Sequence, residues 1–379
     1  MNSSSHGQVL RATAAYTIRR SGRFLVTELL SPHRISSTSS ISGGQRDYLK
    51  FLVNHQSCEG SGHLDLHRKI SAVGQAGYHR EVCESLGLPS EQTAVMGTAA
   101  NMNYAAVRVE KFEETSVCAA VTAGVHGNAA RAADPATWQE TDQGWQPVNP
   151  HSGTINTILI IECPLTPGAL ARSVVTMTEG KSAALAELAI GSRSSQHLAT
   201  GTGTDQFAIA APLDPRRKER ESTSPHSKLG ELIGRAVLEA TKEALRWQNG
   251  LEPSYTRGVI EALGRFGLTL DGVRESIKAQ LSDADFELFA KNEKSALYDP
   301  NVGAGCHAFA AVVDRIEYGA IPRGLASETL RQQAANIATS VAAKPSEWPR
   351  FHDALTVDEA DLVAVVPRAI ALGWKAKWT

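Results

Sequence analysis

Four side chains capable of polar or acid–base chemistry lie close together in residues 122–135. His126, Asn128, Arg131 and Asp134 fall within nine residues, directly after an apolar run that ends in glycine. This pattern predicts a strand followed by a loop, and functional residues concentrate on loops of this kind. An ordinary surface loop is the alternative, with Asn128 and Asp134 capping turns and Arg131 paired with Asp134.

A second candidate is residues 200–205, which read Thr-Gly-Thr-Gly-Thr-Asp. Gly201 and Gly203 let backbone N–H groups converge, and Thr202 and Thr204 add hydroxyls, a combination suited to an anion, an oxyanion or an amide edge. Asp205 would serve as general base or orienting acceptor. The stretch lacks the Gly-Lys-Ser/Thr of a Walker A motif, and the strand expected after it excludes a dinucleotide fingerprint. A tight turn without a chemical role is the alternative.

The third candidate lies on the long helix predicted for residues 167–188. Lys181 occupies a place on its apolar stripe, where a buried ammonium needs a partner. It would polarise a substrate or protonate a leaving group, or it would snorkel and pair with Glu179 or another carboxylate. The stripe repeats every three or four residues as Leu170, Val174, Met177, Ala184 and Leu188.

Two histidines, His63 and His67, are four residues apart and would share one face of a helix, as metal ligands do. No third ligand follows at a recognisable spacing, and the glutamate of the zincin motif is absent. We therefore do not expect a metal site there.

The composition excludes several classes of function. The net charge of -2 offers neither a basic surface for nucleic acid nor a polybasic membrane patch. No apolar run approaches the ~20 residues that span a bilayer, and the first residues do not resemble a secretory signal. Five scattered cysteines without a Cys-x-x-Cys pair indicate neither disulfides nor a zinc ribbon, which favours the cytoplasm.

These residues require strands and helices to position them, and the pattern predicts an α/β (α+β) domain with a mixed, largely antiparallel sheet and covering helices. A polar stretch at 134–153 is expected to be a loop that acts as a lid, and 58–77 is expected to be a loop. Strands are predicted at 15–19, 23–30, 34–41, 104–112, 116–123, 154–163 and 207–211, and helices at 45–54, 79–85, 167–188 and 227–247.

The length of 379 residues predicts two domains. Beyond residue 250 helical periodicity replaces the strand pattern, so we expect an α/β domain over residues 1–249 and an all-α C-terminal domain over residues 250–379. The helices of that domain are expected at 257–265, 270–281, 284–290, 327–342 and 359–371.

In order and spacing, these motifs resemble the adenosylcobinamide amidohydrolase family, the archaeal-type corrinoid salvage enzymes. The resemblance covers about residues 10–247. It is carried by Ser-Ser-Thr-Ser-Ser-Ile-Ser-Gly-Gly at 36–44, Ala-Val-Met-Gly-Thr-Ala-Ala-Asn-Met at 94–102, Thr-Glu-Gly-Lys-Ser-Ala-Ala at 178–184 and His-Ser-Lys-Leu-Gly-Glu-Leu-Ile-Gly at 226–234, and by residues 122–135, 154–161, 165–172 and 199–205.

The resemblance implies hydrolysis of the amide that joins the corrin propionyl side chain to aminopropanol in adenosylcobinamide, giving adenosylcobyric acid for cobalamin salvage. The expected base is Glu179 or Asp205, and Lys181 or His226 would protonate the amine. Thr202 or Thr204 as nucleophile is the alternative to a base acting on water. The expected substrate-binding residues, including an oxyanion site in the Gly-Thr loop, are Asn128, Arg131, Asn156, Gly201, Thr202, Gly203 and Thr204.

Several questions stay open at this stage. The substrate carries cobalt, but no cofactor or metal requirement of the protein can be deduced. Beyond the corrinoid we expect no nucleic-acid or membrane partner, and residues 250–379 would form a homo-oligomer contact, a lid or a docking module. The alternatives are a non-catalytic corrinoid or tetrapyrrole-binding protein, and an amidase for another amide.

Overall fold

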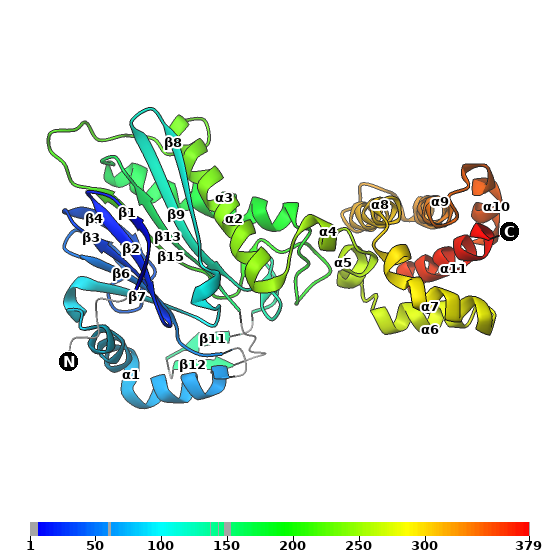
Figure 1. The fold of residues 1–379 in the computed structure, drawn as a ribbon, viewed down its shortest axis with the longest axis horizontal. Helices are drawn as coiled ribbons and strands as arrows, with labels where there is room; N and C mark the ends of the chain where they lie inside the picture. The colour runs from blue at the N-terminus through cyan, green and yellow to red at the C-terminus, as the bar shows by residue number, and fades with distance from the viewer. Residues whose placement is uncertain (1–6, 60–61, 137, 143, 148–152, 379) are drawn as a thin grey trace. The chain divides into compact units, whose positions relative to one another are not determined.

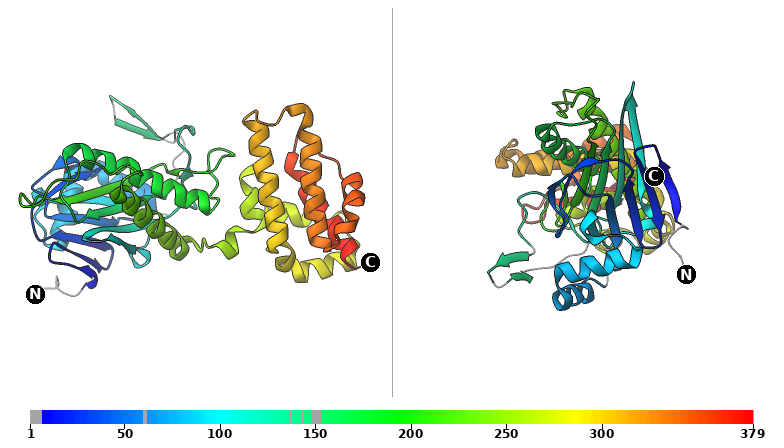
Figure 2. Two further views of the ribbon diagram at one scale, coloured as in Figure 1. Left: turned by 90° about the horizontal axis from the view of Figure 1, so that it is seen from above. Right: turned by 90° about the vertical axis from the view of Figure 1, so that its left-hand side faces the viewer.

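The computed structural model describes residues 7–59, 62–136, 138–142, 144–147 and 153–378 (Figure 1). The chain divides into two compact units. The first contains residues 1–194 and 198–251, and the second contains residues 195–197 and 252–379. Strands occur in the first unit, whereas the described secondary structure of the second is helical (Figure 2).

Two sheets form the framework of the first unit. One has the order β1(Gln8–Ala12), β2(Tyr16–Ser21), β3(Phe24–Leu29), β6(Phe51–Gln56) and β7(Thr93–Thr98). The other has the order β5(Gly44–Arg46), β4(His33–Ser37), β15(Gln206–Pro212), β13(Ile155–Ile161), β9(Thr115–Ala123) and β8(Ala106–Phe112). Neighbours are antiparallel except β6 with β7 and β13 with β15. Two short pairs join β10(Ala129–Ala130) to β14(Gly201–Thr202) and β11(Trp138–Thr141) to β12(Gly144–Pro147).

Apolar side chains fill the first unit on both faces of the second sheet. Cys118 and Ala120 of β9 face a core shared with Tyr16 and Met96 of the first sheet. The alternate β9 residues, such as Val121, face α2(Pro167–Glu187) and α3(Lys228–Asn249). Burial on both sides explains why β9 and β13 read as continuous apolar runs. The other helices of this unit are α1(His63–Leu86), η2(Ser90–Gln92) and η3(Met102–Tyr104).

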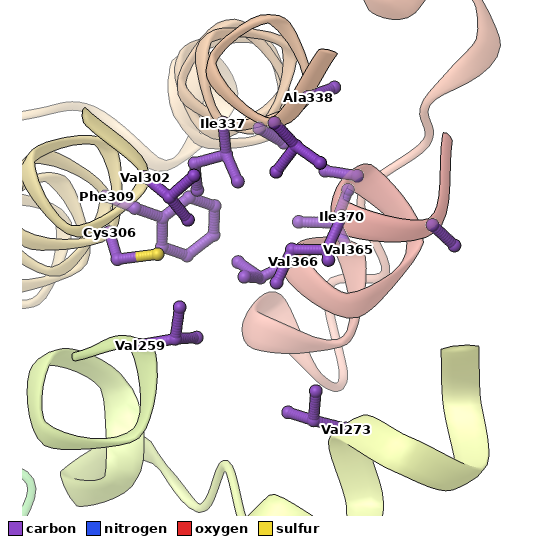
Figure 3. Packing of buried hydrophobic residues seen from close by; sticks show 14 of the residues in the cluster. Val259, Val273, Val302, Cys306, Phe309, Ile337, Ala338, Val365, Val366 and Ile370 are labelled. Atoms are coloured by element: carbon purple, nitrogen blue, oxygen red, sulfur yellow. The ribbon is translucent and has the colours of Figure 1, made fainter. Parts of the chain in front are cut away.

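The second unit has a core of its own. Phe309, Ile337 and Ile370 come from three different helices and are all fully buried in it (Figure 3). The helices are α4(Pro253–Thr256), α5(Val259–Leu263), η4(Gly264–Phe266), α6(Leu270–Lys278), α7(Asp283–Leu297), α8(Pro300–Glu317), α9(Arg323–Ala342), η5(Pro345–Glu347), α10(Trp348–Ala354), η6(Leu362–Ala364) and α11(Val365–Lys377).

The structure confirms the α+β class with a helical C-terminal region. The prediction of a single sheet was wrong, because the longer strands form two sheets that share a core. The helix predicted at 45–54 was also wrong, since β5 and β6 occupy most of those residues. The loop predicted at 58–77 was wrong as well, because most of it belongs to α1. Within residues 134–153, β11 and β12 replace part of the expected loop, while 137, 143 and 148–152 lie outside the described residues.

All five cysteines are described, and each is buried and outside any disulfide bond. Burial raises the pKa of Cys118 to about 11 and that of Cys306 to about 12. None of the helices in the described part of the chain is both long enough and apolar enough to cross a membrane.

Candidate active site

A cavity of about 780 Å³ lies beside the residues that precede β15, a central strand of the second sheet. The turn of α2 that holds Thr178, Lys181 and Ser182 forms one wall, and the paired segments β10 and β14 form another. We call it the lysine cavity. Its lining includes most of the residues singled out in the sequence, namely Asn128, Arg131, Asp134, Lys181, Gly201, Thr202, Gly203, Thr204 and Asp205.

An ion pair between Lys181 and Asp205 stands on the wall of this cavity. Lys181 lies on the buried stripe of α2, as its sequence position indicated, and Asp205 directly precedes β15. The carboxylate also accepts from the Thr202 hydroxyl at 2.5 Å and from the backbone N–H of Ile155 at 3.0 Å. A threonine hydroxyl, a carboxylate and an ammonium are therefore linked by direct hydrogen bonds.

Gly201 makes room for the ion pair. A Cβ atom at this position would overlap an oxygen of Asp205 and would lie 2.7 Å from Nζ of Lys181. Real Cβ atoms do not approach polar atoms so closely, so any larger residue would displace the pair. The glycine is thus required by a close approach of side chains to the backbone.

Asn128 fixes the neighbouring part of the loop. Its amide donates to the carbonyl of Gly153 at 2.9 Å, and Thr204 donates to the same carbonyl at 2.8 Å. Asp134 accepts from the backbone N–H of Arg131 at 2.7 Å and from Ser192 at 2.5 Å. The expected turn cap by Asp134 therefore exists, and it shapes one side of the lysine cavity.

Three of the expected site residues lie elsewhere. Glu179 is exposed on α2 and does not line the lysine cavity. His226 is exposed and lies before the first turn of α3. This helix has 22 residues and is roughly 33 Å long. At its opposite end, Asn249 accepts a hydrogen bond from the backbone N–H of Val125. Asn156 is fully buried between the sheets.

Strand alternation explains the position of Asn156. It shares the face of β13 that carries Ile158 and Ile160, which pack against the first sheet. Its amide donates to Asn54 and to the carbonyl of Gly97, each at 2.9 Å. The side chain therefore stabilises the contact between the two sheets instead of lining the rim of the cavity.

The backbone of the Gly-Thr loop is already hydrogen-bonded. The N–H groups of Thr202, Gly203 and Thr204 donate to Asp205, to the carbonyl of Asn128 and to the Thr202 hydroxyl, respectively. These three N–H groups therefore do not form the oxyanion site expected from the sequence. Positive charge at the cavity comes instead from Lys181 and Arg131.

A second cavity of about 430 Å³ lies on the other side of Thr204. We call it the serine cavity after Ser39, Ser40 and Ser57 in its lining. Tyr78 of α1 also lines it. Burial raises the pKa of Tyr78 to about 12 and lowers that of His55 to about 4. At neutral pH both groups are therefore uncharged, and the Tyr78 hydroxyl is hydrogen-bonded to Nδ1 of His55 at 3.1 Å.

His67 and Trp138 line both cavities. Their rings stack, with centroids 4.6 Å apart and planes inclined by 5°. The sequence suggested His67 only in connection with a metal, and the side chain of His63 lies outside the described part of the structure. The signal for Trp138 in the sequence is an aromatic residue within the polar stretch 134–153.

One group of possible metal ligands occurs among the described residues, in the second unit: His197, Asp314 and Glu317. The guanidinium of Arg265 bonds to both oxygens of Asp314 at 2.7 Å. A cation at this place would compete with a buried arginine, which disfavours metal binding.

Comparison with known proteins identifies a family that matches the greater part of the chain. The family model described as adenosylcobinamide amidohydrolase matches residues 9–253 of this chain. The chain belongs to the adenosylcobinamide amidohydrolase family. The match includes both cavities, whereas residues 254–379 lie outside it.

Two further similarities are weaker. An uncharacterized protein of Methanocaldococcus jannaschii is 37% identical over 186 residues, which are 46% of this chain and 71% of that protein. A Pyrococcus horikoshii protein of known crystal structure is 15% identical, with 63% of this chain and 81% of that chain covered and a TM-score of 0.29. That score is too low to establish a shared fold. Assignment to the amidohydrolase family therefore rests on the family model.

Proposed function

We propose that this protein hydrolyses the amide between the corrin propionyl side chain and aminopropanol of adenosylcobinamide, releasing adenosylcobyric acid for cobalamin salvage in the cytoplasm. Family membership supports the substrate class. The observation that carries the chemistry is the hydrogen bond from the Thr202 hydroxyl to Asp205, whose carboxylate also holds Lys181. These groups meet on the wall of a cavity, where a substrate can reach them.

Thr202 is the proposed nucleophile. Its hydroxyl is weak on its own, and a carboxylate at 2.5 Å can accept its proton as the oxygen attacks. The Thr202 oxygen forms a bond to the amide carbon while its proton passes to Asp205. Thr204 is a poorer candidate, because its hydroxyl donates to a carbonyl group, which is not a base.

Lys181 is the proposed proton donor to the leaving amine. As the C–N bond breaks, its ammonium gives one proton to the nitrogen of aminopropanol, leaving an ester on Thr202. Water then gives a proton to Lys181 and attacks the ester, and Thr202 regains its proton from Asp205. Lys181 and Arg131 supply positive charge for the oxyanion formed at each step.

The test is to assay Thr202→Ala, Thr202→Ser, Asp205→Asn and Lys181→Met for release of adenosylcobyric acid by mass spectrometry. Loss of a nucleophile or its acid–base partner should lower kcat at least ~10²-fold, whereas the serine variant keeps the hydroxyl and much of the activity. A mass increase on Thr202 in quenched reactions would mark the ester.

Matched controls separate the site from its surroundings. Thr204→Ala should lose less than about tenfold, since its hydroxyl does not meet the carboxylate, and exposed Glu179→Gln should keep the wild-type rate. Wild-type turnover in Thr202→Ala would eliminate the threonine as nucleophile. Corrinoid binding without any product would instead indicate a binding protein, and cleavage of unrelated amides alone would indicate another amidase.

A further inference from the structure

The lysine and serine cavities open on the two sides of one short loop. Thr204 lines both, and Thr202 precedes it by two residues, which span at most roughly 7 Å. The division continues along the chain, because Asp205 lines the lysine cavity and the next residue, Gln206, lines the serine cavity. A single ligand of moderate size can therefore occupy both cavities with its reactive bond at Thr202.

The serine cavity offers polar groups that the protein leaves available. Ser39 accepts from the backbone N–H of Val95 at 3.2 Å, and within the described residues its O–H has no acceptor. The amide of Gln206 has no hydrogen-bond partner in that part of the chain either. These groups can bind hydroxyls and ring nitrogens of a ligand. The volume of about 430 Å³ is within the ~300–1,000 Å³ of small-molecule sites.

Flat aromatic surface stands beside these polar groups. The parallel His67 and Trp138 rings lie where the two linings meet, and Tyr78 presents its ring from α1. Because the Tyr78 hydroxyl is already engaged by His55, this residue offers mainly a surface for stacking. Aromatic rings next to hydroxyl and amide groups suit a heteroaromatic base attached to a sugar.

We propose that the serine cavity is the subsite for a nucleoside on the axial position of the corrinoid, with Trp138 as its stacking residue. This inference rests on the proposed function, from which the substrate carries an adenosyl group. In such a corrinoid the axial ligand projects from the face of the ring, whereas the scissile amide extends from the rim. The two groups therefore need two neighbouring cavities, and the loop 202–204 separates them.

The test measures binding of the proposed product, adenosylcobyric acid, and of its analogue dicyanocobyric acid, so it does not depend on turnover. Adenosylcobyric acid and dicyanocobyric acid differ in their axial ligands, and equilibrium dialysis followed by visible absorbance gives the dissociation constant of each. We expect Trp138→Ala to weaken binding of the adenosyl form about tenfold and to change binding of the dicyano form less than twofold. Trp138→Phe should keep most of the affinity, and Trp247→Ala, at an exposed tryptophan outside both linings, should bind both compounds normally.

Two outcomes would overturn the subsite. One is equal weakening for both compounds, which would mean that Trp138 binds the corrin ring, and the other is no change for either. Hydrolysis of adenosylcobinamide by the wild-type protein, assayed in parallel, reports on the proposed function separately. Product release together with unchanged binding in Trp138→Ala would retain the amidohydrolase and remove only the subsite. If the wild-type protein binds neither compound and releases no product, both proposals fail, whereas product release without measurable binding of either compound would remove only the subsite.

Discussion

A lysine on the buried stripe of a helix destabilises the fold unless a carboxylate meets it, and in this protein Asp205 does so. The sequence shows the lysine as an interruption of the apolar repeat, which is why Lys181 could be predicted. It does not show the partner, because Asp205 is 24 residues away and reaches Lys181 only when β15 lies beside α2.

For two other residues, Glu179 and Asn156, the amino-acid type did not predict the position of the side chain in the structure. Glu179 is two positions from Lys181, but two residues on a helix are about 200° apart, so the two side chains point in different directions. Asn156 looked like a ligand-binding amide. Its place between the sheets depends on which face of β13 meets the first sheet, and no local signal specifies that face.

At the residue scale, Gly201→Ala should abolish activity while the protein still folds. The new Cβ would overlap an Asp205 oxygen and would lie 2.7 Å from Nζ of Lys181, so the charged ends of both side chains must shift. We expect a loss of kcat/KM of at least ~10²-fold, measured with adenosylcobinamide, because alignment of the acid–base groups is lost.

Gly168→Ala is the matched control, since a Cβ at that position on α2 meets no atom within 4 Å. It should retain wild-type kcat/KM. Full activity in Gly201→Ala would show that the Lys181–Asp205 contact is not required for catalysis.

At the scale of elements, long segments with a clear apolar stripe were predictable and mainly exposed ones were not. The helix at 167–188 and its Thr166 N-cap were confirmed, because Thr166 accepts from the N–H of Ala169 and Pro167 follows it. In contrast, most of α1 is exposed and Gly74 interrupts its helical backbone at a φ of 73°. Without a stripe, its glycine, serine and histidine residues resemble a loop.

The packing of α2 on α3 gives a prediction at this scale. A Cβ on Gly180 would lie 2.7 Å from the carbonyl oxygen of Gly234, so Gly180→Ala should force the helices apart and lower the free energy of unfolding by about 1–3 kcal/mol. Because Lys181 is the next residue, activity should fall as well. Urea unfolding and the hydrolysis assay measure both effects.

Gly234→Ala tests the same contact from the other helix. A Cβ at that position meets nothing within 4 Å, and alanine favours a helix over glycine by up to ~1 kcal/mol. This variant should be as stable as the wild-type protein or slightly more so. Equal destabilisation by both substitutions would contradict the close approach at Gly180.

For the whole molecule, the sequence located the change from mixed structure to helices near residue 250, and the structure divides the chain at residues 251 and 252. Residues 195–197 group with the second unit although their neighbours along the chain belong to the first. The sequence could not predict this, because the grouping depends on tertiary contacts. The apolar cores follow this division, because one cluster of described residues lies in the second unit and two lie in the first.

Separate cores predict separate effects of core substitutions. Phe309→Ala removes a fully buried ring from the second unit and should destabilise that unit by about 3–5 kcal/mol. Leu159→Ala does the same in the first unit, with an expected loss of about 2–5 kcal/mol. Differential scanning calorimetry should show each substitution shifting one transition. A common shift of a single transition would mean that the two units unfold together.

The five buried cysteines have a practical consequence for following such transitions. A thiol reagent reacts with the thiolate, and burial both hides these sulfur atoms and disfavours their ionisation. Cys306 is in the second unit and the other four are in the first. The natural chain thus carries a reporter of local opening in each half, and the order in which an alkylating agent modifies its cysteines records which half opens first, without any engineered label.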